Sequence, residues 1–383
     1  MAEQTSCRLR RRLVALLLGV GVIALFATAC GGSDEESAEA EGPAANVAQA
    51  EQRVRESMKP TGFAAPGDPI DVSEVEGSEV WFIGATLAIP FVAEVAASFE
   101  EAAEVAGMIP SVCDGKGQVQ DWNRCMNQAL TSGADAIAIQ AIDPRFIEQP
   151  LQRAQEMGIP VIESGVRPLE EEVPETIYGN VNPDLAAVMG RLADYAIWQS
   201  EGDVHALFVI DPTIDIWNSF LELLQAQFDR VCPRCELTVL EFDVAQLATD
   251  LPRKITTELR RDPSINWIIP PFGGAVVHAI EGMRAADALD RVRLVALDGI
   301  AANLDLIREG EVLEADIMLA IAWHGWAQID LIARALLEEP KLNARINQRF
   351  LTEQNLAPTN DVDEILGMEP PFRDQFRRLW GVE

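Results

Sequence analysis

The side chains best placed to do chemistry are polar residues that directly follow apolar runs. Five of them end such runs and are Asp143, Glu163, Ser164, Asp211 and Asp298. Carboxylates and hydroxyls at such positions can hydrogen-bond a ligand, and nothing in their pattern marks a pair of catalytic acids. Ligands of open α/β sheets bind beyond the carboxyl ends of the strands. These residues therefore predict the walls of a binding cleft.

Aromatic side chains occur in several of the same loops. Four of them are expected to converge on the cleft and are Phe91, Trp217, Phe272 and Trp323. Trp122 is a fifth candidate, because a disulfide bond between Cys113 and Cys125 would stiffen its loop and lower the ordering cost of binding. An aromatic face can hold a cation with about 0.5–2 kcal/mol. The alternative for each ring is packing in the hinge or against a helix, and the sequence leaves both open.

Signatures of catalysis are missing from the sequence. The three histidines do not form an H-E-x-x-H pair, and there is no G-x-S-x-G turn or phosphate-binding loop. His205 and His278 lie in apolar segments that suit structural roles. His324 stands beside Trp323 at a predicted helix start and is the histidine best placed to face a ligand. We expect a binding protein and no enzyme, with no cofactor and no metal.

Six cysteines divide into two groups. Cys7 and Cys30 belong to the N-terminal segment, which leaves an even number in a compartment that permits disulfide bonds. Of the three possible connectivities we favour the local one, which joins Cys113 to Cys125 and Cys232 to Cys235. The last pair follows a predicted helix and opens a strand, which is the reverse of a redox C-x-x-C motif. A four-cysteine zinc site is the alternative.

The elements that must position these residues alternate between strand and helix. Residues 134–164 form one βαβ unit, in which the run 136–139 is too apolar for a half-exposed strand and Gly158 ends the helix. Further strands are predicted at 79–85, 109–113, 177–181, 204–210, 237–242, 265–269, 292–297, 312–319 and 349–352. Further helices are predicted at 92–105, 121–130, 185–199, 217–231, 247–261, 275–286, 301–308 and 325–337. This alternation predicts an α/β fold of two doubly wound lobes with parallel sheets.

The N-terminus precedes the folded part. Four arginines stand before the apolar run 13–26, which is too short and too poorly flanked for a stable membrane span. Residues 27–30, Ala-Thr-Ala-Cys, resemble a bacterial lipobox, which implies removal of residues 1–29 and a lipid on Cys30. An ordinary signal peptide is the alternative. Residues 30–77 are expected to form an acidic tether with a helix at 44–58.

Acidic residues outnumber basic residues about two to one. The net charge is −31, with 61 acidic and 30 basic residues in 383. A surface of this sign disfavours nucleic acid as a partner. It keeps the protein soluble and says little about the fold.

The order of several segments resembles a known family. The segments are DPRFIEQPLQRAQEMGIPVI, IYGNVNPDLAAVMG and RLVALDGI. Together they resemble the type I periplasmic solute-binding proteins of the ribose/galactose-binding group, which are extracytoplasmic receptors of ABC importers. The resemblance covers about residues 78–356. It implies two lobes joined by three crossovers, with a ligand closed between them by hinge bending. It also places Phe91 against the ligand and makes Asp298 an acceptor for ligand hydroxyls.

The resemblance also implies domain limits. The N-lobe would comprise 78–182 and 322–345, and the C-lobe 183–321 and 346–356. A tail at 357–383 would wrap the surface, anchored by Phe372, Phe376 and Trp380. The protein would be a monomer, held on the outer face of the cell membrane by the lipid on Cys30.

Departures from the family pattern bear on the ligand. After GIPVI the sugar-binding members carry an Asp-Arg pair, whereas residues 163–167 here read Glu-Ser-Gly-Val-Arg. A buried hydroxyl without a partner costs about 1–3 kcal/mol, so a cleft with few polar groups would suit a less hydroxylated, aromatic, lipophilic or cationic solute. We expect a lipoprotein that delivers a sugar-like or less polar solute to an ABC permease. A receptor that presents its closed form to a membrane sensor kinase or chemoreceptor is the alternative.

Overall fold

The computed structural model describes residues 43–382. The predicted signal peptide, Cys30 and the acidic residues up to position 42 lie outside the described residues. Within 43–382, no helix combines the length and the apolar character that a membrane crossing requires.

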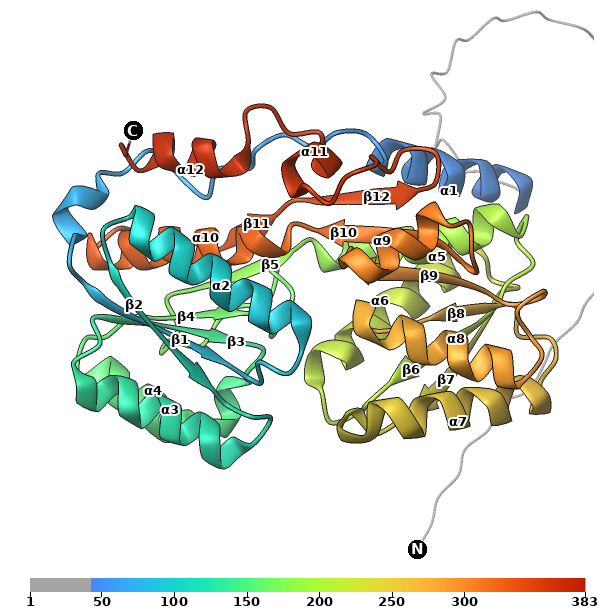
Figure 1. Ribbon diagram of the computed structural model, residues 1–383, viewed down its shortest axis with the longest axis horizontal. Helices are drawn as coiled ribbons and strands as arrows, with labels where there is room; N and C mark the ends of the chain where they lie inside the picture. The colour runs from blue at the N-terminus through green and yellow to red at the C-terminus, as the bar shows by residue number, and fades with distance from the viewer. Residues whose placement is uncertain (1–42, 383) are drawn as a thin grey trace, which may run out of the picture. The chain divides into compact units, whose positions relative to one another are not determined.

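Two six-stranded sheets carry the fold, one in each lobe (Figure 1). The N-lobe order is β11-β5-β4-β3-β1-β2 with all neighbours parallel. The C-lobe order is β12-β10-β9-β8-β6-β7, and only β12 runs antiparallel to its neighbour. The same winding occurs twice, which confirms the predicted pair of doubly wound lobes.

The strands and helices follow in chain order. The N-lobe strands are β1 (Glu79–Gly84), β2 (Ile109–Asp114), β3 (Ala136–Gln140), β4 (Val161–Ser164), β5 (Gly179–Pro183) and β11 (Ala344–Ile346). The C-lobe strands are β6 (His205–Ile210), β7 (Glu236–Glu241), β8 (Trp267–Ile269), β9 (Arg293–Asp298), β10 (Leu313–Leu319) and β12 (Gln348–Thr352). The helices are α1 (Pro43–Ser57), α2 (Pro90–Val105), α3 (Val119–Ser132), α4 (Glu148–Glu156), α5 (Leu185–Gln199), α6 (Asp215–Val231), α7 (Leu247–Arg261), α8 (Val276–Ala285), α9 (Ala301–Arg308), α10 (Ile321–Leu336), α11 (Val362–Leu366) and α12 (Phe372–Leu379).

Helices cover both faces of the N-lobe sheet. Val80 and Phe82 belong to the core formed with α2 and α10, whereas Trp81 and Ile83 belong to the core formed with α3 and α4. Successive side chains of a strand point to opposite faces, so a strand covered on both sides must be apolar throughout. Strand β3 is buried at all five positions for the same reason.

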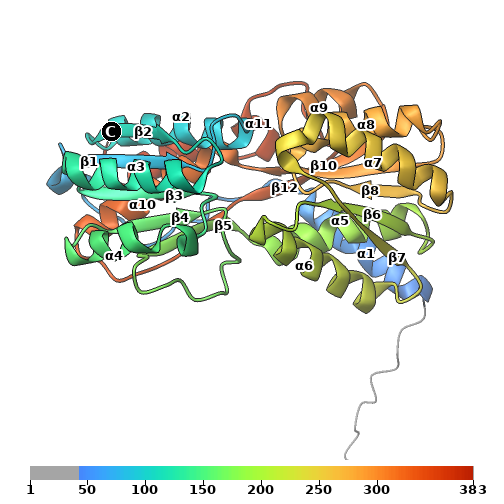
Figure 2. The same cartoon turned by 90° about the horizontal axis from the view of Figure 1, so that it is seen from below.

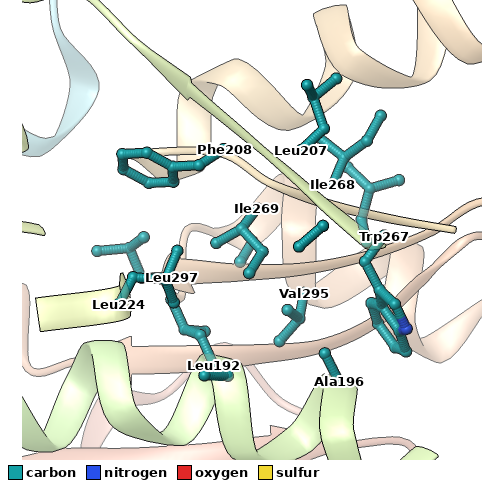
Figure 3. Close-up of a cluster of buried hydrophobic side chains, with 14 of the residues drawn as sticks. Leu192, Ala196, Leu207, Phe208, Leu224, Trp267, Ile268, Ile269, Val295 and Leu297 are labelled. Carbon is teal, nitrogen blue, oxygen red and sulfur yellow. The ribbon is translucent and has the colours of Figure 1, made fainter. Parts of the chain in front are cut away.

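The C-lobe repeats this arrangement. Helices α7 and α8 lie on one side of its sheet, and α5 and α6 lie on the other (Figure 2). Figure 3 shows part of the core, where Leu192 and Ala196 of α5 face Val295 and Leu297 of β9. This packing fixes the strand ends of the lobe on a rigid base.

The segment expected to be a tether belongs to the fold from residue 43 onward. Helix α1 packs against α5, with Ala50 and Val54 fully buried. Arg53 binds the buried carboxylate of Asp194 at 2.6 Å. After α1 the chain runs to the N-lobe, where Phe63 stacks on Trp323 with ring centroids 5.0 Å apart. The predicted helix at 44–58 is found as α1. The prediction of an acidic tether over 30–77 is wrong for residues 43–77, because apolar side chains of this segment pack into the core.

The C-terminal tail lies on the same side of the molecule as α1 (Figure 1). Phe372, Phe376 and Trp380 are fully buried, as expected for anchors. Trp380 stacks on Trp326 at 5.2 Å and donates a hydrogen bond to Asp330 at 2.8 Å. The tail therefore forms a further layer over α10.

Three connections link the sheets. The chain leaves the N-lobe sheet after β5, returns between β10 and α10, and passes to the C-lobe sheet between β11 and β12. The sheets thus assign 79–183 and 321–346 to one lobe and 185–319 and 348–352 to the other. The three-residue strand β11 was not predicted.

Candidate binding cleft

A cavity of about 350 Å³ lies between the two lobes. Its walls come from the carboxyl ends of strands in both sheets, including Ala85 after β1, Gln140 in β3 and Asp298 in β9. Small-molecule sites of proteins have volumes of roughly 300–1,000 Å³. The winding of each sheet places such a site where strand order reverses, next to β1 and β3 in the N-lobe and β6 and β8 in the C-lobe.

The N-lobe wall contributes two aromatic side chains named in the sequence analysis. Phe91 lies in the first turn of α2 and meets the ring of His324 edge-on at 5.2 Å. Trp122 lies in α3 and donates its indole N–H to the carbonyl oxygen of Ala85 at 2.9 Å. Because that donor is occupied, Trp122 offers its ring rather than a hydrogen bond to the cavity.

The C-lobe wall contains a stack of aromatic rings. Trp217 lies almost parallel to Phe272, with ring centroids 5.4 Å apart and planes 7° apart. Phe242 continues the stack behind Trp217 at 6.0 Å. Both Trp217 and Phe272 line the cavity. The stack forms a broad apolar platform whose rings hold one another in place.

Asp298 is the charged group of the C-lobe wall. Its backbone has φ of +90°, a value that Asp and Asn adopt more readily than most residues. One carboxylate oxygen accepts the N–H of Gly273 at 2.7 Å. Burial raises the pKa of Asp298 to about 6, the Gly273 N–H opposes this, and the nearby charge of Glu94 raises it further. No Lys or Arg within the described residues pairs with it.

Asp143 lines the cavity but is already neutralised. It caps the turn after β3 by accepting the backbone N–H of Arg145 at 2.8 Å. The guanidinium of Arg145 binds the same carboxylate at 2.7 Å and also contacts Asp215 of the C-lobe. Arg145 therefore bridges the lobes through two carboxylates that both line the cavity.

The placement expected for Glu163 and Ser164 is corrected by the structure. Both are fully buried and neither lines the cavity. Glu163 instead pairs with Arg167 at 2.5 Å, and burial raises its pKa although this pair opposes the shift. Ser164 lies beside Gln140 in the sheet, behind the cavity wall. Glu163 in β4 and Arg167 after it thus neutralise each other.

Asp211 is also placed behind the wall. It accepts hydrogen bonds from Thr213 at 2.7 Å and from the N–H of Val244 at 3.0 Å. Burial alone would raise the pKa of Asp211, but these hydrogen bonds hold it below its ordinary value. The carboxylate shapes the loop between β6 and α6, so that Thr213 reaches the cavity in its place.

The expectation that Trp323 lines the cleft is wrong. Its side chain is fully buried between Phe63 and Phe372, on the side of α10 that faces the two terminal segments. His324, one position along the helix, lines the cavity. Burial lowers the pKa of His324 to about 4, so its ring is neutral at pH 7.

Sequence reasoning missed several polar residues of the wall, among them Gln140 and Asn182. Gln140 ends β3 and is fully buried, and its amide nitrogen has no hydrogen-bond partner in the described part of the chain. Asn182 lies in β5 and donates to the carbonyl oxygen of Arg167 at 2.7 Å. The signal for both is a polar residue near the end of an apolar strand, the same pattern that selected Asp298.

The cysteines pair locally, as favoured from the sequence. Cys113 is bonded to Cys125 and Cys232 to Cys235. The first bond ties the end of β2 to α3, the helix that carries Trp122. Residues 43–382 contain no cluster of three or more side chains suited to hold a metal ion.

Solved structures share this architecture at low sequence identity. An ABC sugar transporter subunit from Rhodobacter sphaeroides has a TM-score of 0.65 at 13% identity, covering 73% of this chain and 100% of that one. An ABC transporter solute-binding protein from Agrobacterium vitis with bound allitol has a TM-score of 0.63 at 17% identity, covering 76% and 98%. One from Mycobacterium smegmatis with bound glycerol has a TM-score of 0.64 at 17% identity, covering 73% and 95%. These likenesses show the fold.

Sequence comparison gives the family. No curated protein matches the sequence. The family model described as periplasmic binding protein domain matches residues 80–339, which span both lobes and every strand end around the cavity. The chain therefore belongs to the periplasmic binding protein domain family and has its type I fold.

Proposed function

We propose that the chain captures a small solute between its lobes and delivers it to an ABC permease. The observation that carries this proposal is the cavity of about 350 Å³, lined by strand ends of both sheets. A solute that touches both walls favours the closed arrangement of the lobes, because it contacts both only there. A permease can then distinguish the loaded receptor from the empty one.

The known ligands of similar proteins suggest where a search should begin. Similar structures contain bound allitol, D-allose or glycerol. A sugar or polyol is one candidate for this cavity. A less polar, aromatic or cationic solute is the other, because aromatic and aliphatic side chains form most of the wall.

A panel of solutes tests the proposal. The full chain is melted with sugars, polyols, amines and aromatic acids, each at 1 mM or more. A bound solute stabilises the folded state by about 2.7 kcal/mol at a hundredfold excess over its dissociation constant. We expect at least one solute to raise the melting temperature. A panel without any shift would contradict the proposed function.

The variant Phe91→Ala locates the bound solute, because Phe91 lines the cavity and packs against His324. We expect the thermal shift to shrink in this variant. Phe146→Ala is unsuitable as a control, because Phe146, although 47% exposed, also borders the cavity. The control is therefore Val277→Ala, on the exposed face of α8. An equal shift in all three proteins would place the solute elsewhere.

The membrane anchor is a separate part of the proposal. We propose that the chain is a monomer outside the cytoplasm, attached through a lipid on Cys30. Growth of the producing bacterium with labelled palmitate should label the wild-type chain but not Cys30→Ala. Equal labelling of the two chains would count against lipidation at Cys30.

A further inference from the structure

The charges around the cavity leave one carboxylate without a cation. Asp143, Asp215 and Asp298 line the cavity, and none of the described residues that line it is Lys or Arg. Arg145 serves Asp143 and Asp215 together. Among the described residues, the partner of the Asp298 carboxylate is the backbone N–H of Gly273 at 2.7 Å, which carries no full charge. Asp298 is thus the cavity carboxylate whose negative charge no Lys or Arg of the described residues balances.

Two further acidic side chains add to the negative charge around Asp298. Glu94 approaches Asp298 from α2, and Asp316 approaches it from β10. Asp316 is fully buried and accepts hydrogen bonds from Gly299 and Asn303, both at 2.9 Å. A buried anion that lacks a partner costs several kcal/mol, and a cation beside it recovers much of that cost. An anionic solute would instead be repelled.

The rest of the wall suits an apolar body. The rings of Phe91, Trp217 and Phe272 line the cavity together with aliphatic side chains such as Leu185 and Ile214. Each sugar hydroxyl left unpaired against such a wall costs about 1–3 kcal/mol. Aromatic faces also attract an organic cation.

A second, independent group points to the same ligand. Gln140 lines the N-lobe wall, and its buried amide nitrogen has no hydrogen-bond partner among residues 43–382. Its amide oxygen already accepts from Gln328 at 2.9 Å. A ligand acceptor such as a phenol or ether oxygen would satisfy this nitrogen.

We propose that the cleft selects a protonated organic amine whose apolar, ring-sized body carries a hydrogen-bond acceptor, with Asp298 binding the ammonium group and Gln140 the acceptor. This inference rests on the proposed solute-binding function of the same cavity. It names a ligand class that differs from the polyols and sugars bound by the similar structures.

Calorimetric titration of the full chain with matched probes tests the inference. Tyramine carries the amine, tyrosol replaces it with a neutral hydroxyl, and 3-(4-hydroxyphenyl)propionate replaces it with an anion. At pH 7.5 we expect tyramine to bind at least tenfold more tightly than tyrosol, and the propionate not to bind. Equal affinities for tyramine and tyrosol would overturn the role of the ammonium group.

The variant Asp298→Asn tests the carboxylate, and Asn suits the positive φ of this position. It should weaken tyramine binding at least tenfold and weaken tyrosol binding much less, because a neutral hydroxyl loses no attraction between opposite charges. Asp305→Asn, on an exposed position of α9, should change neither. A tyramine affinity that survives in Asp298→Asn would overturn the assignment.

The pH dependence of tyramine binding to the wild type tests the Asp298 carboxylate without a substitution. Asp298 has a pKa of about 6, so protonation removes its charge at lower pH while the amine stays charged. Tyramine affinity should fall about tenfold from pH 7 to pH 5. A flat profile would contradict the proposal.

Sugars separate this inference from the proposed function. D-Allose and D-ribose are titrated in parallel. If either binds in the cavity and tyramine does not, the amine inference fails and the solute-binding function stands. If no member of the wider panel binds, both fail.

Discussion

At the scale of single residues, the last position on a strand does not by itself bring a side chain into the cleft. Gln140 and Ser164 are paired in register, as are Ile139 and Glu163. Glu163 therefore lies one position inside the sheet, where Arg167 neutralises it. Ser164 ends β4 beside Gln140, and only Gln140 lines the cavity. The sequence indicated that polar groups gather at strand ends, but which of them reaches the cavity depends on contacts between distant segments.

The direction in which each side chain of a helix points could not be predicted either. Trp323 and His324 are neighbours at the start of α10, so they point about 100° apart around the helix. The sequence could not show which of them faces the cleft, because the aromatic partners of Trp323 come from both termini of the chain. Phe91 and Trp217 lie in the first turns of α2 and α6, and Phe272 lies in the loop after β8. All three line the cavity, as expected from the sequence.

Asp316 supplies a prediction about stability. Burial raises its pKa to about 7, Asn303 opposes the shift, and the charge of Asp298 adds to it. The unfolded chain has the ordinary value of about 3.9. The folded chain therefore holds this proton more tightly than the unfolded chain does. The stability that results is complete below about pH 4, decreases as the pH rises and is lost once the pH has passed 7.

The variant Asp316→Asn should remove this dependence. Relative to the variant, the wild type should lose a few °C of melting temperature between pH 5 and pH 8. The exposed Asp305→Asn serves as the control and should follow the wild type. Parallel curves for wild type and Asp316→Asn would show that the Asp316 carboxylate titrates outside this range.

At the scale of elements, the terminal segments are part of the folded body. Most strands and helices followed from apolar runs and their period, because burial on both faces of a parallel sheet leaves a clear pattern. The helix at 44–58 and the tail anchors Phe372, Phe376 and Trp380 were expected, but the elements that these segments pack against were not. Their residues contact elements more than a hundred positions away, such as Arg53 with Asp194, and short segments carry little periodic signal.

The variant Trp380→Ala tests the role of the tail. Trp380 is fully buried, stacks on Trp326 and hydrogen-bonds Asp330, which is itself buried and paired with Arg334 at 2.7 Å. Truncation of a buried Trp costs about 3–5 kcal/mol. We expect this loss in the free energy of unfolding measured with guanidinium chloride.

The control for this measurement is Val277→Ala, at a position with 43% exposure on α8. It should change the free energy of unfolding by no more than about 0.5 kcal/mol. A loss below about 1 kcal/mol for Trp380→Ala would mean that the tail does not contribute to the core.

At the scale of the whole chain, two lobes meet around one cavity and are joined by three connections. Arg145 adds a contact across the cleft, through Asp143 on one side and Asp215 on the other. Its side chain is 70% exposed, and exposed ion pairs contribute about 0–1 kcal/mol. The bridge therefore biases the closed arrangement without locking it.

The variant Arg145→Ala should shift the free protein toward open arrangements. A larger part of the free energy of solute binding would then be used to close the lobes. We therefore expect the affinity for the solute to weaken by up to about fivefold, the equivalent of 1 kcal/mol. Arg253→Ala is the matched control, because Arg253 is equally exposed and pairs with Asp250 within one lobe. Calorimetric titration gives both values, and an equal loss in the two variants would contradict a bridge between lobes.

The central claim is that a solute bound between the lobes holds them closed. Small-angle X-ray scattering measures this directly, on wild type and Arg145→Ala, with and without a saturating amount of the solute that gives the largest thermal shift. We predict a smaller radius of gyration with solute, and a larger decrease in Arg145→Ala because its free form is more open. An unchanged radius of gyration at saturation in both proteins would contradict closure of the lobes on the solute.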